Sequence, residues 1–320
     1  GPNVVAHERH YTGPTLWHLL THSWSRSFTL ALLAVLTSGC VQNAPVGAPL
    51  SPVSPTAIPI PLPSFTPIVP TEQVPTSMPT QACTEQAGSL QTGMYRGIAV
   101  AQDIPYAAYL PPCYGASEER YPTLYLLHGY PYDEAHWSRL GAIEIADDRI
   151  GAGEWPAFIM VMPLQPEPLY RSSDGGPGSY ETEFLEGLVP FIEGNYRSNP
   201  SERALAGVSR GGVWALEIGL RNPMEFASVA ALSPALAVNS ARPPYDPFEI
   251  VASSDRFPPN ILLLAGDDDW AAVETERLSR VLGDAGVEHT FQITAGDHSD
   301  TTWAAVVSDV LGFLVLQRGP

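Results

Sequence analysis

Short apolar runs recur along the chain from about residue 83, and turn residues bound each of them. These runs predict eight strands, at residues 93–100, 104–111, 123–128, 158–164, 204–208, 228–233, 260–265 and 289–294. The inner runs, such as 123–128 and 260–265, are apolar at almost every position. Strands that helices cover on both faces have this composition, so the sequence predicts a buried parallel sheet.

Longer segments with helical spacing alternate with the later strands. They are residues 181–196, 210–221, 271–285 and 301–316. In the third segment, Leu278 and Leu282 belong to an apolar face that recurs at helical spacing. Alternation of strand and helix predicts an α/β fold with a mainly parallel sheet and helices on both faces. No helix separates the first two strands, so we expect them to pair antiparallel at one edge.

A much shorter apolar run, residues 28–36, lies near the N-terminus between Arg26 and the small residues that end in Cys40. This arrangement is typical of an export signal, and the run is too short to span a bilayer. It resembles a bacterial lipoprotein signal, although Leu36 lies four rather than three residues before the cysteine. The resemblance implies lipidation of Cys40 and an export signal at residues 1–40. Another export route and a plain buried helix are the alternatives.

The next segment, residues 41–82, is rich in proline; 11 of the 33 prolines fall within residues 41–80. Proline fixes φ and lacks a backbone donor, so this segment is predicted to be a disordered or extended linker. With a lipid on Cys40, it would be a stalk that holds a catalytic domain, residues 83–320, away from a membrane. The alternative is a leader without a role.

Charge and cysteine content narrow the possible partners. The net charge is −18, which opposes binding to phosphate backbones and anionic lipid, so no nucleic-acid partner is expected. Membrane contact is then expected only through the lipid anchor. The three cysteines form no metal-binding pattern, so no metal site is expected. With Cys40 lipidated, Cys83 and Cys113 are predicted to form a disulfide in an oxidising compartment.

The segment 207–211 reads Gly-Val-Ser-Arg-Gly and joins the apolar run 204–208 to the helical segment 210–221. A strand, a sharp turn and a helix in this order are typical of a nucleophile elbow. The elbow needs glycines because neighbouring backbone approaches the turn too closely for larger side chains. The pattern predicts Ser209 as a nucleophile; the alternative is an ordinary turn between strand and helix.

A serine hydroxyl needs a general base, and the chain order in such folds is serine, acid, histidine. Two histidines follow Ser209, namely His289 and His298. His289 opens a predicted strand, whereas His298 lies in the loop just beyond that strand. Chemistry in α/β enzymes is placed beyond the carboxyl ends of strands, so we predict His298 as the base.

The acid is expected in the loop after strand 260–265, where Asp267, Asp268 and Asp269 are adjacent. One of them would accept a hydrogen bond from the imidazole and stabilise the imidazolium. The other two would be solvated or would cap helix 271–285; a calcium site is a further alternative. The residue types alone leave the three open.

Two backbone N–H groups are candidates for stabilising an oxyanion. Arg210 begins a predicted helix, so its N–H is free of an intrahelical partner. The loop after strand 123–128 begins with His128, Gly129, Tyr130 and Pro131. Pro131 has no N–H, which makes Tyr130 the second candidate donor. His128 is expected to be a structural hydrogen-bonding residue rather than a base.

The segments 109–112 (Tyr-Leu-Pro-Pro), 121–129 (Tyr-Pro-Thr-Leu-Tyr-Leu-Leu-His-Gly), Tyr180-Glu181, 207–212 and 296–298 (Gly-Asp-His) together carry a family pattern. In this order they resemble the esterase D type family of α/β hydrolases over roughly residues 90–316. That family includes feruloyl and acetyl xylan esterases, S-formylglutathione hydrolase and mycolyltransferases. The resemblance implies the α/β-hydrolase fold. Its usual Gly-x-x-Asp pattern implies that Asp269 is the acid.

Aromatic side chains near the expected site are candidate substrate contacts, although most buried aromatic residues belong to cores. They are Tyr130, Tyr132, Trp137, Trp270 and Trp303. Two long segments, 165–180 and 236–259, are expected to cover the site partly and to determine specificity.

These observations predict a secreted or cell-surface serine carboxylester hydrolase that forms an acyl-enzyme and uses no cofactor. Its expected substrate is an ester, either feruloylated or acetylated polysaccharide or another aryl or short-acyl ester. An acyltransferase with the same triad is one alternative. A non-enzymatic surface binding module is another, and the presence of all the catalytic residue types argues against it.

Overall fold

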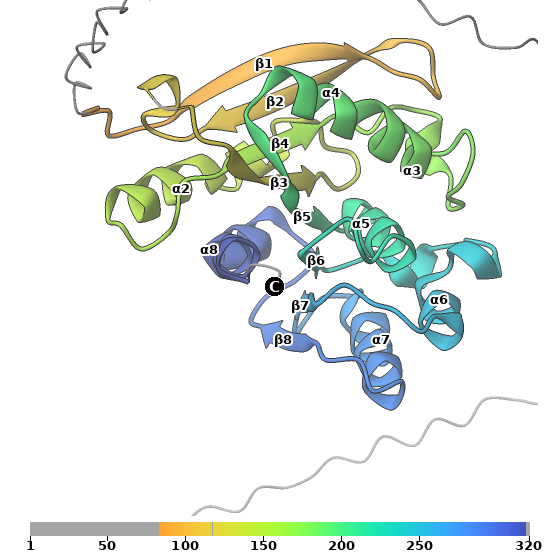
Figure 1. Ribbon diagram of the computed structural model, residues 1–320. Helices are drawn as coiled ribbons and strands as arrows, with labels where there is room; N and C mark the ends of the chain where they lie inside the picture. The colour runs from red at the N-terminus through yellow and green to blue at the C-terminus, as the bar shows by residue number, and fades with distance from the viewer. Residues whose placement is uncertain (1–82, 117, 318–320) are drawn as a thin grey trace, which may run out of the picture. The chain divides into compact units, whose positions relative to one another are not determined.

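An eight-stranded sheet forms the centre of the computed structural model, which describes residues 83–116 and 118–317 (Figure 1). The strands are β1 (Ser89–Arg96), β2 (Asp103–Leu110), β3 (Tyr121–Leu127), β4 (Ile159–Pro163), β5 (Ser198–Val208), β6 (Ser228–Leu232), β7 (Asn260–Gly266) and β8 (Thr290–Thr294). Their order across the sheet is β1-β2-β4-β3-β5-β6-β7-β8. The predicted number of strands is confirmed.

Neighbouring strands from β4 to β8 run parallel, whereas β1 pairs with β2 and β2 pairs with β4 in antiparallel register. The sheet is therefore mainly parallel with an antiparallel edge, as the sequence predicts. Parallel strands need crossover connections, and helices supply them here. As a result, the loops after β3, β5, β6, β7 and β8 all lie at the same edge of the sheet.

Eight α-helices flank the sheet within the described residues. They are α1 (His136–Arg139), α2 (Ala142–Gly151), α3 (Tyr180–Thr182), α4 (Val189–Asn195), α5 (Arg210–Arg221), α6 (Pro247–Ser253), α7 (Ala272–Asp284) and α8 (Asp300–Leu316). A π-helical segment, Glu183–Leu188, joins α3 to α4, so the predicted helix 181–196 is one continuous but irregular helix. The sequence pattern does not predict three of the helices: α1 and α6, which are short, and α2, which is weakly amphipathic.

The helices form two layers, one on each face of the sheet (Figure 1). α2 and α8 pack on one face, against side chains such as Leu124 and Leu126. α4 and α5 pack on the other face, where Tyr125 and Leu127 project. Successive side chains of β3 thus enter opposite cores, which explains why this strand is apolar at nearly every position.

Two predicted strands have wrong boundaries: β5 begins at Ser198 rather than at residue 204, and the first strand is displaced as a whole. It spans Ser89–Arg96 rather than 93–100, because the chain turns at residues 97–102. The Gly97 N–H donates to the Gln102 carbonyl (2.8 Å), and Ala101 adopts a positive φ of 48°. Within residues 97–100, the Ile98 side chain is 51% exposed, and the Ala99 N–H donates to Glu183 Oε2 (2.7 Å) at the start of the π-helical segment.

Several predictions concern residues that the structure does not describe. The export signal at 1–40, Cys40 and the proline-rich linker at 41–82 lie outside the described residues. Among the residues that are described, no helix combines the length and the apolar character that crossing a membrane requires.

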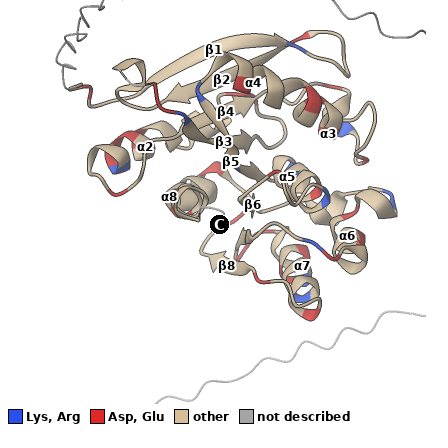
Figure 2. Ribbon diagram, viewed as in Figure 1, with Lys and Arg blue, Asp and Glu red and all other residues tan. Residues whose placement is uncertain are grey.

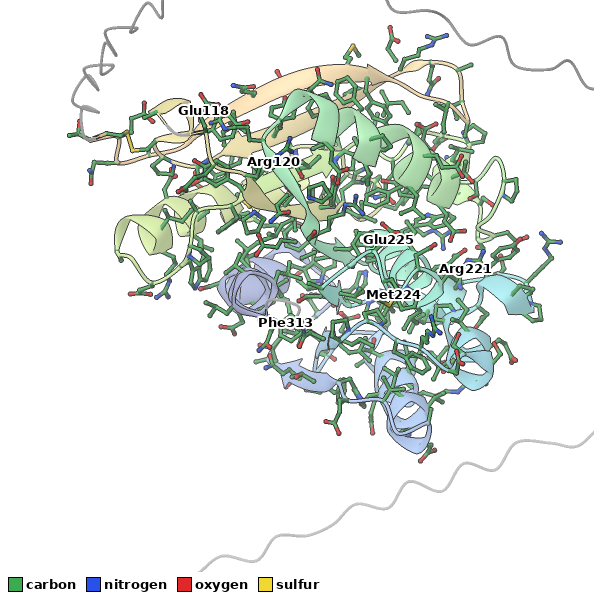
Figure 3. The ribbon with its side chains drawn as sticks, in the orientation of Figure 1. Glu118, Arg120, Arg221, Met224, Glu225 and Phe313 are labelled. Atoms are coloured by element: carbon green, nitrogen blue, oxygen red, sulfur yellow. A yellow bond between two sulfur atoms is a disulfide. The ribbon has the colours of Figure 1, made fainter. Side chains whose placement is uncertain are left out.

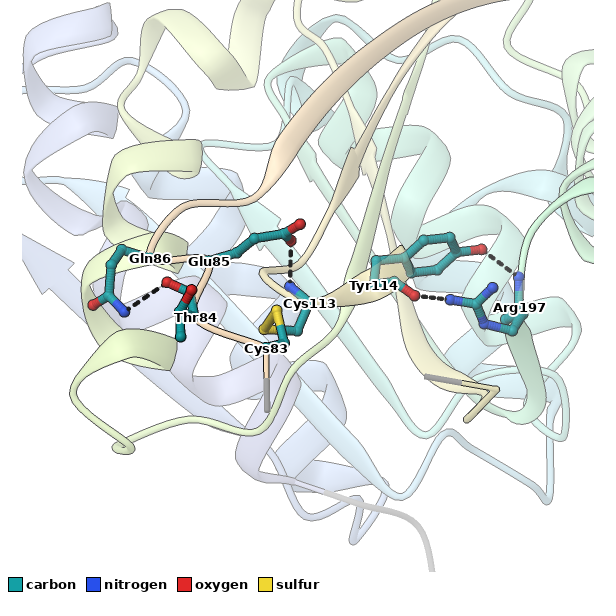
Figure 4. The surroundings of a disulfide bond; sticks show 7 residues. All are labelled: Cys83, Thr84, Glu85, Gln86, Cys113, Tyr114 and Arg197. Atoms are coloured by element: carbon teal, nitrogen blue, oxygen red, sulfur yellow. Dashed lines mark hydrogen bonds between the residues drawn. A yellow bond between two sulfur atoms is a disulfide. The ribbon is translucent and has the colours of Figure 1, made fainter. Parts of the chain in front are cut away.

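Cys83 and Cys113 form a disulfide, as predicted, with their Cα atoms 5.7 Å apart (Figure 4). The bond joins the first described residue to the segment just after β2, and so encloses the whole β1–β2 hairpin. The Cys113 N–H also donates to Glu85 Oε2 (2.8 Å). β1 is an edge strand that pairs with β2 alone. The disulfide ties the chain before β1 to the chain after β2, and so helps to keep the two strands together.

We expect the Cys83→Ser, Cys113→Ser double variant to unfold at a lower temperature than the wild type. The cysteines are 30 residues apart, and closing a loop of this size stabilises a fold by about 3–4 kcal/mol through the unfolded chain. Thermal denaturation with and without reductant measures the effect. Reductant should lower the melting temperature of the wild type only. Equal melting temperatures of oxidised wild type and variant would refute this role.

Candidate active site

Ser209 occupies a sharp turn between β5 and α5. Its backbone has φ 53° and ψ −114°, a combination that is strained for a residue with a side chain. A Cβ on Gly207 would lie 2.0 Å from the Gly211 carbonyl oxygen, and one on Gly211 would lie 2.4 Å from the His128 carbonyl oxygen. Only glycine fits at either position, which is the close backbone approach expected of a nucleophile elbow.

Ser209, His298 and Asp269 form a continuous hydrogen-bonded relay. His298 Nε2 lies 2.9 Å from Ser209 Oγ, and His298 Nδ1 lies 2.8 Å from Asp269 Oδ1. The three residues follow β5, β8 and β7, so the parallel sheet brings together positions that are up to 89 residues apart. The arrangement allows Nδ1 to donate to the carboxylate while Nε2 accepts the serine proton.

The three adjacent aspartates have different environments. Asp269 is 5% exposed and faces His298, whereas Asp267 and Asp268 are exposed. Asp267 Oδ1 instead accepts the Gly296 N–H (2.9 Å) and so holds the loop that carries the histidine. Burial raises the pKa of Asp269, but hydrogen bonds with His298, Ser233 and the Ala271 N–H outweigh it, so the net pKa shift is downward. Asp269 is therefore a carboxylate at neutral pH.

Two tryptophans hold the His298 ring in place. The ring centre of Trp270 lies 4.4 Å from that of His298, and Trp303 meets the ring edge-on at 4.9 Å and 85°. Trp303 is 2% exposed, and its Nε1 donates to Ser233 Oγ (3.0 Å). The prediction of Trp303 as a substrate contact is therefore wrong, because its side chain packs behind the histidine.

The two candidate oxyanion donors belong to the β5–α5 turn and to the loop after β3. Arg210 is the first residue of α5, where backbone N–H groups have no intrahelical partner. Tyr130 follows Gly129, and a Cβ on Gly129 would lie 3.2 Å from Ser209 Cβ. The β3 loop thus passes directly against the nucleophile.

His128 fixes the β3 loop as a structural residue. Its Nε2 accepts the Gln165 N–H (2.9 Å), which leaves Nδ1–H to donate to the Gly129 carbonyl (2.9 Å). Burial lowers the pKa of His128 to about 4, so the imidazole is neutral near pH 7. The expectation that His128 is a structural hydrogen-bonding residue agrees with these contacts.

A second buried histidine, His136, also supports this loop and was not found by sequence reasoning. Its Nε2 lies 3.1 Å from Asp300 Oδ1, and its Nδ1 lies 3.4 Å from the Gly129 nitrogen. The Tyr132 ring stacks on it at 3.8 Å. His136 lies in the four-residue helix α1, which has no periodic pattern, so nothing in the sequence distinguishes it.

A pocket of about 540 Å³ opens above Ser209. Its lining is Tyr130, Tyr170, Arg171, Ser173, Ser209, Arg210, Ala235, Val238, Ser240, Trp270 and His298. Tyr130 and Trp270 were predicted to lie here. The two long segments predicted to cover the site supply Tyr170 and Val238 among others, although the individual residues were not foreseen.

Two other aromatic predictions need correction. Trp137 is fully buried, and its Nε1 donates to the Leu127 carbonyl (3.0 Å), so it belongs to the core under α8. Tyr132 is outside the pocket lining because its ring stacks on His136. The other histidine after Ser209, His289, is absent from the pocket lining and contacts Ser279 Oγ (2.7 Å).

A pair of buried acids, Glu181 and Glu217, lies beside Gly175. Arg221, the last residue of α5 (labelled in Figure 3), donates to Glu181 Oε1 (3.0 Å). Glu217, one turn earlier on α5, is fully buried. Burial, followed by repulsion from Glu181, raises the pKa of Glu217 to about 9, although Arg210 and Arg221 oppose the rise. Glu217 is therefore protonated and uncharged near pH 7.

Comparison with known proteins places this site in a family. The family model described as "Putative esterase" matches residues 98–314, a range that contains Ser209, Asp269 and His298. A curated relative, the endo-1,4-beta-xylanase/feruloyl esterase of Xylanibacter ruminicola, is 34% identical over 135 residues, which are 39% of this chain and 19% of that protein. The chain thus spans about a fifth of the length of this relative.

Solved structures show the same fold. A ferulic acid esterase superposes with a TM-score of 0.65 at 24% identity, covering 73% of this chain and 99% of that one. S-formylglutathione hydrolase from Staphylococcus aureus gives a TM-score of 0.63 at 18% identity, covering 71% and 99%. The chain therefore has the α/β-hydrolase fold, as the sequence resemblance implied.

The protonated Glu217 makes stability depend on pH. Between pH 4.5 and about 9, Glu217 keeps its proton in the folded protein but has released it in the unfolded chain. The stability of the wild type should therefore fall as the pH rises through this window. The loss is up to about 1.4 kcal/mol per pH unit. Glu217→Gln keeps the shape without the titration. We expect the melting temperature of Glu217→Gln, relative to that of the wild type, to be higher at about pH 8 than at about pH 5.

Glu186→Gln is the matched control, because Glu186 is exposed on the nearby π-helical segment. Thermal denaturation at both pH values measures all three proteins. A difference between Glu217→Gln and wild type that stays constant with pH would contradict a neutral buried Glu217.

Proposed function

The chain belongs to the Putative esterase family, and we propose that it is a serine carboxylester hydrolase that acts through Ser209, His298 and Asp269. The observation that carries the proposal is the relay from Ser209 Oγ through His298 to Asp269, with both distances below 3.0 Å. A serine at a strained elbow, within hydrogen-bond reach of an imidazole nitrogen, is the arrangement that acyl transfer requires.

In the proposed mechanism, Ser209 Oγ attacks the ester carbonyl while His298 Nε2 takes the hydroxyl proton. Asp269 stabilises the imidazolium that forms, since its carboxylate accepts from Nδ1. The N–H groups of Arg210 and Tyr130 bind the oxyanion of the tetrahedral intermediate. Collapse of the intermediate expels the alcohol, which takes the proton from His298, and leaves an acyl group on Ser209. His298 then activates water, which releases the acid and restores the serine.

We further propose an aryl or short acyl ester as substrate, including the feruloyl or acetyl esters of polysaccharides. The Tyr130 and Tyr170 rings stack in the pocket wall at 5.6 Å, and Trp270 lies across the pocket against His298. Flat apolar surfaces of this kind suit an aromatic group. The names of the Xylanibacter ruminicola relative and of the ferulic acid esterase structure support the same substrate class.

We propose that the enzyme acts outside the cell, either secreted or anchored through a lipid on Cys40. The support is the short apolar run at 28–36, the small residues that end in Cys40 and the proline-rich stretch that follows. The Cys83–Cys113 disulfide is consistent with this location, because such bonds persist in oxidising compartments.

The Ser209→Ala variant should lose at least about 10⁴-fold in kcat on a short-chain nitrophenyl ester, because the nucleophile is gone while binding remains. Initial rates of purified protein measure the loss. Ser253→Ala, on the exposed face of α6, is the control and should retain full activity. Substantial activity in a folded Ser209→Ala protein would eliminate this serine as the nucleophile.

Single Asn substitutions separate the three aspartates. Asp269→Asn should lower kcat by about 10³–10⁴-fold, since the amide no longer stabilises the imidazolium and favours the wrong tautomer. Asp268→Asn should have little effect. Asp267→Asn should lose less than tenfold, because it only loosens the loop held at Gly296. Equal losses in all three variants would show that Asp269 is not the acid.

A further inference from the structure

The pocket above Ser209 has an unusual charge for this protein. The chain carries 34 acidic and 16 basic residues, yet the pocket lining contains Arg171 and Arg210 and no aspartate or glutamate. A second hollow of about 530 Å³ lies on the other side of residues 236–241, and its lining includes Asp246, Glu249 and Glu274. The absence of acids from the pocket lining is therefore a local property of the candidate active site.

The guanidinium of Arg210 is held by neutral acceptors. Its Nε donates to the Tyr170 carbonyl (3.2 Å), Nη1 donates to Asn239 Oδ1 (3.2 Å), and Nη2 donates to the Ser172 carbonyl. These three bonds tie both pocket-covering segments to the start of α5. A guanidinium has five N–H groups, so these three bonds leave one N–H on Nη1 and one on Nη2 unused.

No carboxylate within the described residues forms an ion pair with Arg210. Other arginines, such as Arg149, Arg203 and Arg280, pair with glutamates, and Figure 2 shows blue and red positions close together on α2 and α7. The acid whose charge would act on Arg210 is Glu217, two turns further along α5. Because the pKa of Glu217 is about 9, this acid does not neutralise the guanidinium near pH 7.

Arg210 is also largely withdrawn from water, and burial lowers its pKa. A cation that is partly desolvated and unpaired interacts strongly with any anion that reaches it. The N-terminal end of α5 adds positive potential at the same place. Both charged residues that line the pocket are thus cations, in a protein whose net charge is −18.

We propose that this pocket selects esters whose acyl or alcohol part carries a carboxylate, which Arg210 binds. Arg171, at the exposed rim, attracts the same group, although it is shared with Glu167 (Nε–Oε1 3.0 Å). The inference rests on the proposed ester hydrolase function and adds a charge requirement to its substrate. A carboxylate matches the planar N–H pairs of a guanidinium and can form two parallel hydrogen bonds with them.

The test uses two pairs of substrates that differ in charge but little in shape. The first pair, para-nitrophenyl hydrogen adipate and its methyl ester, places the charge in the acyl part. The second pair, para-acetoxybenzoate and its methyl ester, places it in the alcohol part. For each pair, the ratio of kcat/KM for the anionic ester to that for the neutral ester is measured. We expect wild type to prefer the anion by about tenfold in at least one pair.

Using the ratio cancels any general loss of activity, which is necessary because Arg210 adjoins the nucleophile. Arg210→Gln should bring the ratio close to one, whereas Arg210→Lys, which keeps the charge, should retain most of it. Arg171→Gln should lower the ratio by about two- to threefold, because an exposed charge is screened. Arg280→Gln is the matched control for Arg171→Gln. Like Arg171, Arg280 pairs with a glutamate four residues before it, but it lies on α7, outside the pocket lining. Its ratio should equal that of wild type.

The outcomes separate this inference from the proposed function. If wild type hydrolyses the neutral esters but shows no anion preference in either pair, the inference is wrong and the hydrolase proposal stands. If Arg210→Gln and Arg210→Lys lose the preference equally, loop positioning rather than charge sets it, and the inference is again wrong. If no ester is cleaved faster than by Ser209→Ala, the proposed function itself fails.

Discussion

The constraint on which the site depends is the close approach of the β5–α5 turn to its neighbouring backbone. Gly207 and Gly211 allow Ser209 to adopt φ 53°, and this conformation points the hydroxyl away from the sheet toward His298. The strain at one residue persists because buried strands on both sides and the fully buried face of α5 hold the turn. The same turn places the Arg210 N–H at a free helix end. This one turn therefore supplies the nucleophile, an oxyanion donor and two of the residues that line the pocket, Ser209 and Arg210.

The parallel sheet brings loops from distant parts of the chain together in one site. The loops after β3, β5, β7 and β8 converge at a single edge, and each contributes a side chain or N–H group that the mechanism uses. Side chains outside the catalytic relay then fix these loops: the buried His128 and His136 hold the β3 loop, while the exposed Asp267 holds the loop that carries His298. His128 is uncharged near pH 7, because burial lowers its pKa to about 4, so this support of the β3 loop adds no charge beside Ser209.

The sequence predicted the parts of the molecule that local physics determines. Apolar runs identified all eight strands, and the glycines around Ser209 identified the elbow, because both signals are contiguous in the chain. Residues 97–100 were misassigned because an apolar turn packed against the π-helical segment looks like a strand. Trp137 was misassigned because an aromatic residue beside a site loop has the same sequence signal whether it enters the pocket or the core. Tyr170 and Val238 were not foreseen, since their segments lack periodicity and are placed only by tertiary contacts.

Arg210 shows why substrate recognition is harder to predict than catalytic chemistry. Its position next to Ser209 is fixed by the elbow pattern, but its effect depends on partners that come from elsewhere in the chain. Tyr170 and Asn239 supply neutral acceptors, and the acid nearest to it, Glu217, loses its charge only because it is buried beside Glu181. If that acid were ionised, its charge would oppose that of the guanidinium, and the proposed preference for a carboxylate would weaken. The electrostatic character of the pocket is therefore set by a residue outside it. A pocket lining alone does not define specificity, because the protonation of the groups behind the lining decides which charges a substrate meets.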